Sequence, residues 1–200
     1  MKAFFKEHSY NMVKMFLDQF AAAIFGFSLC LACGYARNYT LRNVTSCCAI
    51  AFYLFLLYVM TWELGFRDRA ALEGGKQRRN PWKGALISLC ANSINYLLAI
   101  FILLGHLLPG GFFGSLGAFS ASAAILLEGM YMGILAHPIN GVALNNLWYM
   151  YFLIPLPAIL TSGIAYYMGS RDLKLTPIGD YVYPDSDRDK KKKRWNISRD

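Results

Sequence analysis

The sequence predicts an all-α protein, a polytopic transmembrane helix bundle with about five hydrophobic spans. Of its 200 residues, 56% are hydrophobic and only 16% are charged, whereas soluble domains carry about 25% charged residues. From Gly84 to Ser170 the only formally charged residue is Glu128. The apolar runs are continuous and about twice the length of a membrane β-strand, which is about ten residues of alternating polarity. A water-soluble fold and a membrane β-barrel are therefore both disfavoured.

The orientation of the bundle is predicted by the basic connector Arg67–Lys83, which separates two apolar runs and has Trp62 and Trp82 at its shoulders. Its basic residues are Arg67, Arg69, Lys76, Arg78, Arg79 and Lys83. Short basic loops stay in the cytoplasm, so we expect the connector and the N-terminus to be cytoplasmic. The same residues are candidates for contacts with anionic lipid headgroups.

Two spans precede the connector. Residues 1–14 form a basic leader, which is either a short amphipathic helix on the inner membrane surface or a flexible segment. The first span is expected at 15–36, with Gln19 near the interface, and the second at 44–62. The bulky aromatic centre of the second span favours contact with lipid.

The third span, expected at 84–108, is apolar except for one face. At 100° per residue that face gathers Ser88, Asn92, Asn95 and His106. A polar stripe of this kind should turn toward other helices or a water-filled cavity.

The sharp turn Pro109-Gly110-Gly111 leads to the fourth span, expected at 115–136. Its many small residues let helix backbones approach closely, so we expect it in the middle of the bundle. After an uncharged link, the fifth span at 148–168 contains Pro155 and Pro157, which should bend it. The chain thus divides into the leader 1–14, one transmembrane domain 15–169 and a polar, lysine-rich tail 170–200 that is expected to be disordered.

The side of the tail is left open by the charges. Five crossings place the tail opposite the cytoplasmic connector, although positive residues favour the cytoplasm. The lysine cluster of the tail lies beyond the 15–20 residues that count most in this rule. The alternative is that 115–136 is re-entrant and enters and leaves on one side, buried by its neighbours.

Glu128 is the strongest candidate for a functional residue. A carboxylate near the middle of a span costs about 2.5–3.5 kcal/mol to insert, so it is usually paired, protonated or facing water. The tight turn makes the third and fourth spans antiparallel neighbours, so we expect Glu128 to meet Asn92 and Asn95, with His106 on the same stripe. This set predicts a proton-coupled or cation-binding site. The structural alternative is that these groups hydrogen-bond one another and hold the bundle together.

The function class predicted is a non-enzymatic transporter subunit or an accessory component of a membrane complex. The alternatives are a membrane-embedded enzyme acting on a lipid-linked substrate and a purely structural or regulatory membrane partner. Motifs of membrane metalloproteases, serine hydrolases and P-loop proteins do not occur in the sequence, so we expect no catalytic residues, no metal and no cofactor. The expected partners are the lipid bilayer and possible membrane or cytoplasmic subunits, with no nucleic acid, because the basic residues lack a recognisable nucleic-acid-binding module.

Three stretches carry a resemblance to other proteins. They are EHSYNMVKMFLDQF leading into the first span, TWE at the end of the second, and IPLPAILTSGIAYYMGSRD before the lysine-rich tail. The chain resembles uncharacterised small multi-pass membrane proteins of Gram-positive bacteria over most of its length. This resemblance implies a bacterial plasma membrane and brings no catalytic or binding motif.

Overall fold

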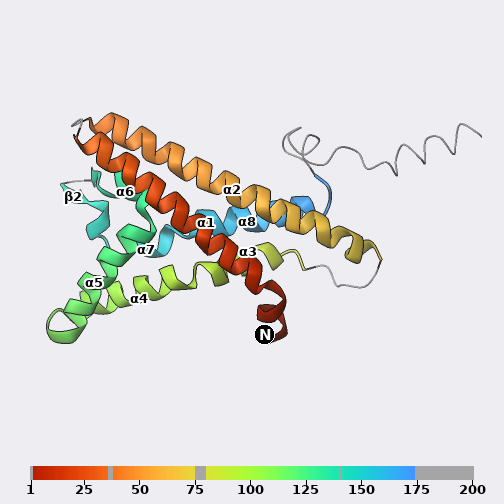
Figure 1. Cartoon of the computed structure of the whole chain (residues 1–200). Helices are drawn as coiled ribbons and strands as arrows, with labels where there is room; N and C mark the ends of the chain where they lie inside the picture. The colour runs from red at the N-terminus through yellow and green to blue at the C-terminus, as the bar shows by residue number, and fades with distance from the viewer. Residues whose placement is uncertain (1, 36–37, 75–79, 140, 174–200) are drawn as a thin grey trace, which may run out of the picture.

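The computed structural model describes residues 2–35, 38–74, 80–139 and 141–173. Its elements are α1 (Lys2–Tyr35), α2 (Tyr39–Glu73), α3 (Lys83–Ala91), α4 (Ser93–Leu107), α5 (Gly111–Leu127), η1 (Gly129–Tyr131), α6 (Met132–Leu135), β1 (Pro138–Ile139), β2 (Val142–Ala143), η2 (Leu144–Asn146), α7 (Met150–Leu153) and α8 (Leu156–Gly169). The two strands form only a two-residue antiparallel hairpin. The prediction of an all-α bundle is confirmed (Figure 1).

Helices α1 and α2 are much longer than a hydrocarbon core. With 34 and 35 residues they are roughly 51 and 52 Å long at 1.5 Å per residue, whereas the core is about 30 Å thick. They run side by side as an antiparallel pair (Figure 1). The leader 1–14 is therefore not separated from the first span by a break in the helix, and the loop expected at 37–43 is shorter, because α2 begins at Tyr39.

Five apolar segments are present in the described part of the chain. Three helical stretches, 4–35, 40–69 and 150–169, are long and apolar enough to cross a membrane. Two further segments qualify only as bent pairs, α3 with α4 at 55° and α5 with the η1–α6 stretch at 82°. Gly110 and Gly111 make the predicted turn between α4 and α5 with φ of 129° and 54°, values that L side chains rarely adopt. These apolar helices fit an integral membrane protein.

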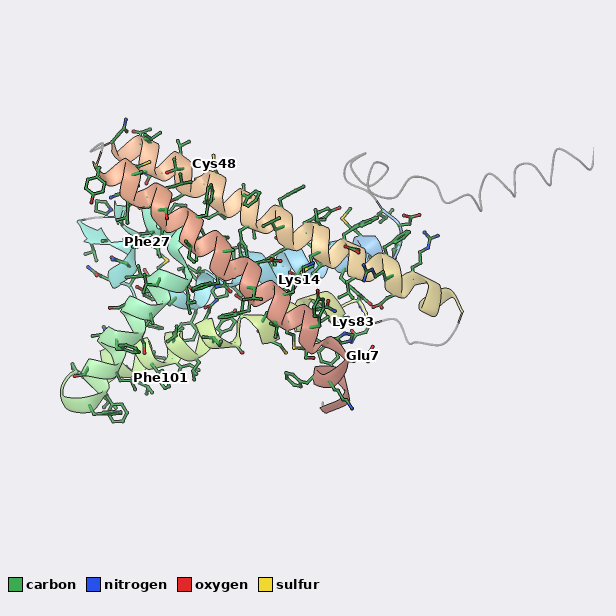
Figure 2. All side chains as sticks on the ribbon, viewed as in Figure 1. Glu7, Lys14, Phe27, Cys48, Lys83 and Phe101 are labelled. Atoms are coloured by element: carbon green, nitrogen blue, oxygen red, sulfur yellow. The ribbon has the colours of Figure 1, made fainter. Side chains whose placement is uncertain are left out.

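The connector end, as we call it, is the end of the bundle where α1 and α3 begin and α2 and α8 end (Figure 1). Lys83 Nζ lies 2.7 Å from Asp68 Oδ2, and Tyr166 Oη donates to the same oxygen at 2.8 Å. Arg69 pairs with Asp172 at 2.6 Å. These contacts join α2, α3 and the end of α8, and Figure 2 shows Lys83 beside the first turns of α1.

The basic residues of the connector have different positions. Arg67 and Arg69 lie within α2, and Arg67 is exposed and pairs with Glu63 one turn away. Lys83 is only 7% exposed, so its assignment to the headgroup-binding set is corrected: its ammonium is held by Asp68 inside the protein. Lys76, Arg78 and Arg79, like the tail from residue 174 onward, lie outside the described residues.

Glycines allow α8 to lie directly against α2 and α3. A Cβ atom on Gly169 would collide with the carbonyl oxygen of Trp62, and one on Gly84 would collide with that of Ser162. Trp62 Nε1 also donates to the carbonyl of Leu173 at 2.8 Å, just beyond α8. The end of the last span is thus fixed beside the end of α2.

The fourth apolar segment is divided between the edge and the centre of the bundle. Its first part, α5, pairs with α4 through the close approach of Gly117 to Gly105 and leaves Phe112 and Phe119 exposed. Its second part, from Glu128 to α6, is buried against α1 and α2. There Gly133 N donates to Ser46 Oγ at 3.0 Å. The expected central position therefore holds only for this second part.

The path of the chain resembles the re-entrant alternative. The α3–α4 segment leaves the connector end, and α7–α8 returns to it. Between them, α5, η1 and α6 stay at the opposite, distal end, where α6 packs beside the start of α2 (Figure 1). The stretch from α3 to α8 therefore begins and ends at the connector end, with α5–α6 at the distal end between its two halves.

Candidate functional site

A small cavity of about 10 Å³ lies where three apolar segments are interrupted. The interruptions are at Asn92 between α3 and α4, at Glu128 between α5 and η1, and at Pro155 between α7 and α8. The cavity is lined by Gln19, Tyr53, Asn92, Asn95, Glu128, Met130, Tyr131, Ile154, Pro155 and Ala158. All five apolar segments therefore contribute to one site.

Each interruption has a local cause. The side-chain amide of Asn92 donates to the carbonyl of Ser88 at 2.9 Å, as does its backbone N–H, and such side-chain bonds compete with the helix ladder. Glu128 has φ −111° and ψ 25°, outside the helical region, and the next residue, Gly129, fits tightly against the carbonyl of Ala23. Pro155 has no N–H to donate to the preceding turn.

The polar groups around the cavity are only partly satisfied. Asn95 Nδ2 donates to Asn92 Oδ1 at 3.0 Å, and Gln19 Nε2 donates to the carbonyl of Leu127 at 3.4 Å. Three buried oxygens have no hydrogen-bond partner, namely Asn95 Oδ1, Glu128 Oε2 and Tyr131 Oη. Their residues are 3%, 1% and 9% exposed, so bulk solvent does not reach these oxygens. Buried oxygens in this state are rare and call for a physical explanation.

The structure brings together three of the four residues proposed from the sequence. Asn92, Asn95 and Glu128 line the same cavity, as expected if the third and fourth spans are antiparallel neighbours. His106 does not line it: it is exposed on the last turn of α4, with its ring 6.3 Å from that of Trp148. His106 shares the face of α4 that carries Asn95, but it lies about three turns further along the helix, beyond the cavity, so its inclusion is corrected.

Sequence reasoning missed the contributions of the first two spans. Gln19 was expected near the interface, but it is buried and reaches the C-terminal end of α5. Tyr53 was taken as part of a lipid-facing aromatic run, yet it is 2% exposed. Tyr131 follows Glu128 by three residues and was not singled out. Gln19 was visible as a polar residue in an apolar run, but no spacing connected it with Glu128.

Glu128 dominates the electrostatics of the cavity, since it is the only formally charged residue in the lining. At each interruption one helix ends and another begins, so the partial charges of opposite sign at the two helix ends largely cancel. Within the described residues, no three His, Cys, Asp or Glu side chains lie close enough to share a metal ion. The arrangement is suited to holding a proton or one small cation by oxygen atoms.

Comparisons with protein-family models, with curated proteins and with solved structures found no match to this chain. The function is therefore argued from the geometry and chemistry of the cavity.

Proposed function

We propose that this protein is the membrane component of a cation-coupled transport system and that Glu128 binds the coupling proton or cation. One observation supports this above all others: a buried carboxylate with an unpartnered oxygen lies where three interrupted apolar segments meet. Carboxylates inside membranes are costly and are associated with ion pathways and proton relays.

The interrupted helices strengthen this proposal. In membrane transporters, discontinuous helices place their ends and unwound backbone at the binding site, and one part of the bundle then rocks against another. Here the breaks at Asn92, Glu128 and Pro155 are the points at which such a motion is proposed to occur. The connector end, in contrast, is tied together by the bonds of Asp68 to Lys83 and Tyr166.

The structural alternative, in which the polar groups mainly hold the bundle together, has less support. Asn92 and Asn95 make their side-chain hydrogen bonds within the third apolar segment, to Ser88 and to each other. Bonds within one segment contribute little to holding different segments together. A carboxylate kept only for stability would also be expected to use both oxygens.

The same proposal includes a plasma-membrane location with the N-terminus and the 67–83 connector in the cytoplasm. The positive charge of the connector supports this orientation. The exposed guanidinium of Arg67 suits an anionic headgroup. Arg69, Lys76, Arg78 and Arg79 are proposed for the same role. A further membrane or cytoplasmic subunit is a proposed partner.

Uptake into liposomes tests the proposed function without knowledge of the substrate. The full chain is reconstituted, an inward Na⁺ or proton gradient is imposed, and a mixture of small metabolites is supplied outside. Mass spectrometry of the lumen should find at least one compound that accumulates only with the gradient. In the Glu128→Gln variant this accumulation should fall to the level of protein-free liposomes, because the amide carries no charge to balance a cation.

The matched control is Glu63→Gln, which makes the same chemical change on α2 outside the cavity and should transport like the wild type. Wild-type accumulation by a correctly assembled Glu128→Gln protein contradicts the proposal. So does the absence of any gradient-dependent accumulation by the wild-type chain.

A further inference from the structure

We propose that the cavity binds a single dehydrated Na⁺ ion. This inference rests on the proposed function, because it gives Glu128 the same role, and it adds the identity of the ion and its ligands. The ligands are Glu128 Oε2, Asn95 Oδ1 and Tyr131 Oη.

The charge of the cavity matches a monovalent cation. Glu128 is the only charged residue in the lining, and no Lys, Arg or His is part of it. One positive charge therefore neutralises the site. A divalent cation leaves a net positive charge among apolar groups such as Met130 and Ile154, which is strongly unfavourable.

The chemistry of the three oxygens also matches the ligand preference of a hard cation such as Na⁺. Hard cations prefer oxygen ligands from carboxylates, amides and hydroxyls, and each of the three oxygens lacks a hydrogen-bond partner. Asn95 Nδ2 is committed to Asn92 Oδ1, which leaves Oδ1 as the free end of that amide. A proton on Glu128 Oε2 alone has no acceptor within hydrogen-bond distance, so it leaves the other two oxygens unsatisfied.

The size of the cavity favours Na⁺ among the common alkali cations. Its volume of about 10 Å³ is at the lower limit of the space that admits one water molecule, about 10–15 Å³. There is no room for a hydration shell, so the ion must exchange its water for protein oxygens. Na⁺ is smaller than K⁺ and binds oxygen at shorter distances, so we assign Na⁺ to this small site.

Carbodiimide labelling of the full chain in mild detergent tests the sodium assignment. A hydrophobic carbodiimide reacts with a protonated carboxyl group inside the membrane, and a bound cation blocks that reaction. Peptide mass spectrometry should find label on Glu128 in choline chloride. NaCl at ten times the dissociation constant should slow labelling about tenfold, because about one site in eleven is then free. KCl at the same ionic strength should protect much less.

The second readout is thermal unfolding of the wild type and of Asn95→Leu and Glu63→Gln variants. NaCl should raise the midpoint of the wild type and of Glu63→Gln relative to choline chloride, and it should not raise that of Asn95→Leu. Labelling of Glu128 that is equally fast in NaCl and choline overturns the sodium site alone, since a proton-coupled role is still tested by the uptake experiment. Failure of Glu128 to react in either salt overturns the cation site itself.

Discussion

Replacing Lys83 by methionine is expected to lower the free energy of unfolding by about 3–5 kcal/mol, the usual cost of removing one partner of a buried ion pair. The Lys83 side chain is 9% exposed, and its ammonium lies 2.7 Å from a carboxylate oxygen of Asp68 that also accepts a hydrogen bond from Tyr166. Methionine fills a similar volume but leaves the largely buried Asp68 carboxylate, whose side chain is 17% exposed, with the tyrosine as its remaining partner. Titration with sodium dodecyl sulfate in mixed micelles measures the change.

Two variants serve as controls for this prediction. The double variant Asp68→Asn, Lys83→Met removes both charges and should recover much of the lost stability, because no unpaired charge remains buried. Arg67→Met removes the exposed pair with Glu63 and should cost at most about 1 kcal/mol. Equal stability of Lys83→Met and Arg67→Met contradicts the burial of Lys83.

The second prediction concerns membrane topology, and its outcome is all-or-none because each tag is accessible from one side of the membrane or from the other. Epitope tags inserted after Gly74 in the connector and added at the C-terminus should be accessible from the same side in intact cells. A tag between Gly110 and Gly111 should be accessible from the other side. The reason is that the last span ends beside α2, with Gly169 against Trp62 and Asp172 paired with Arg69, as expected for a re-entrant α5–α6.

The control for this experiment is permeabilisation, which should make all three tags accessible. A C-terminal tag on the side of the Gly110 tag means that 111–135 crosses the membrane. That result contradicts the packing of α8 at the connector end.

Composition and spacing were sufficient to predict the class of fold and the placement of Asn92, Asn95 and Glu128 near one another. A single acid in a long apolar region, and a tight turn between two spans, placed Glu128 beside Asn92 and Asn95. The sequence could also locate the turn at Pro109-Gly110-Gly111, because glycine at positive φ has a recognisable pattern.

The failures concern positions along a helix and contacts between segments. His106 is on the same face of α4 as Asn95, but it lies about three turns further along that helix, and angular position alone does not reveal this separation. Lys83 was read as a loop residue, but it begins α3 and finds its partner Asp68 fifteen residues earlier. Periodicity within one segment does not reveal bonds between segments, and so Gln19 and Tyr53 were also missed.

Binding of radioactive Na⁺ to the purified full chain tests most directly the claim that the interrupted helices form a cation site at Glu128. We expect one saturable site per chain in the wild type and in Glu63→Gln, displaced by unlabelled NaCl far better than by KCl. Glu128→Gln should bind no Na⁺ above background while it elutes as the same folded species. Saturable binding by Glu128→Gln equal to that of the wild type contradicts the account.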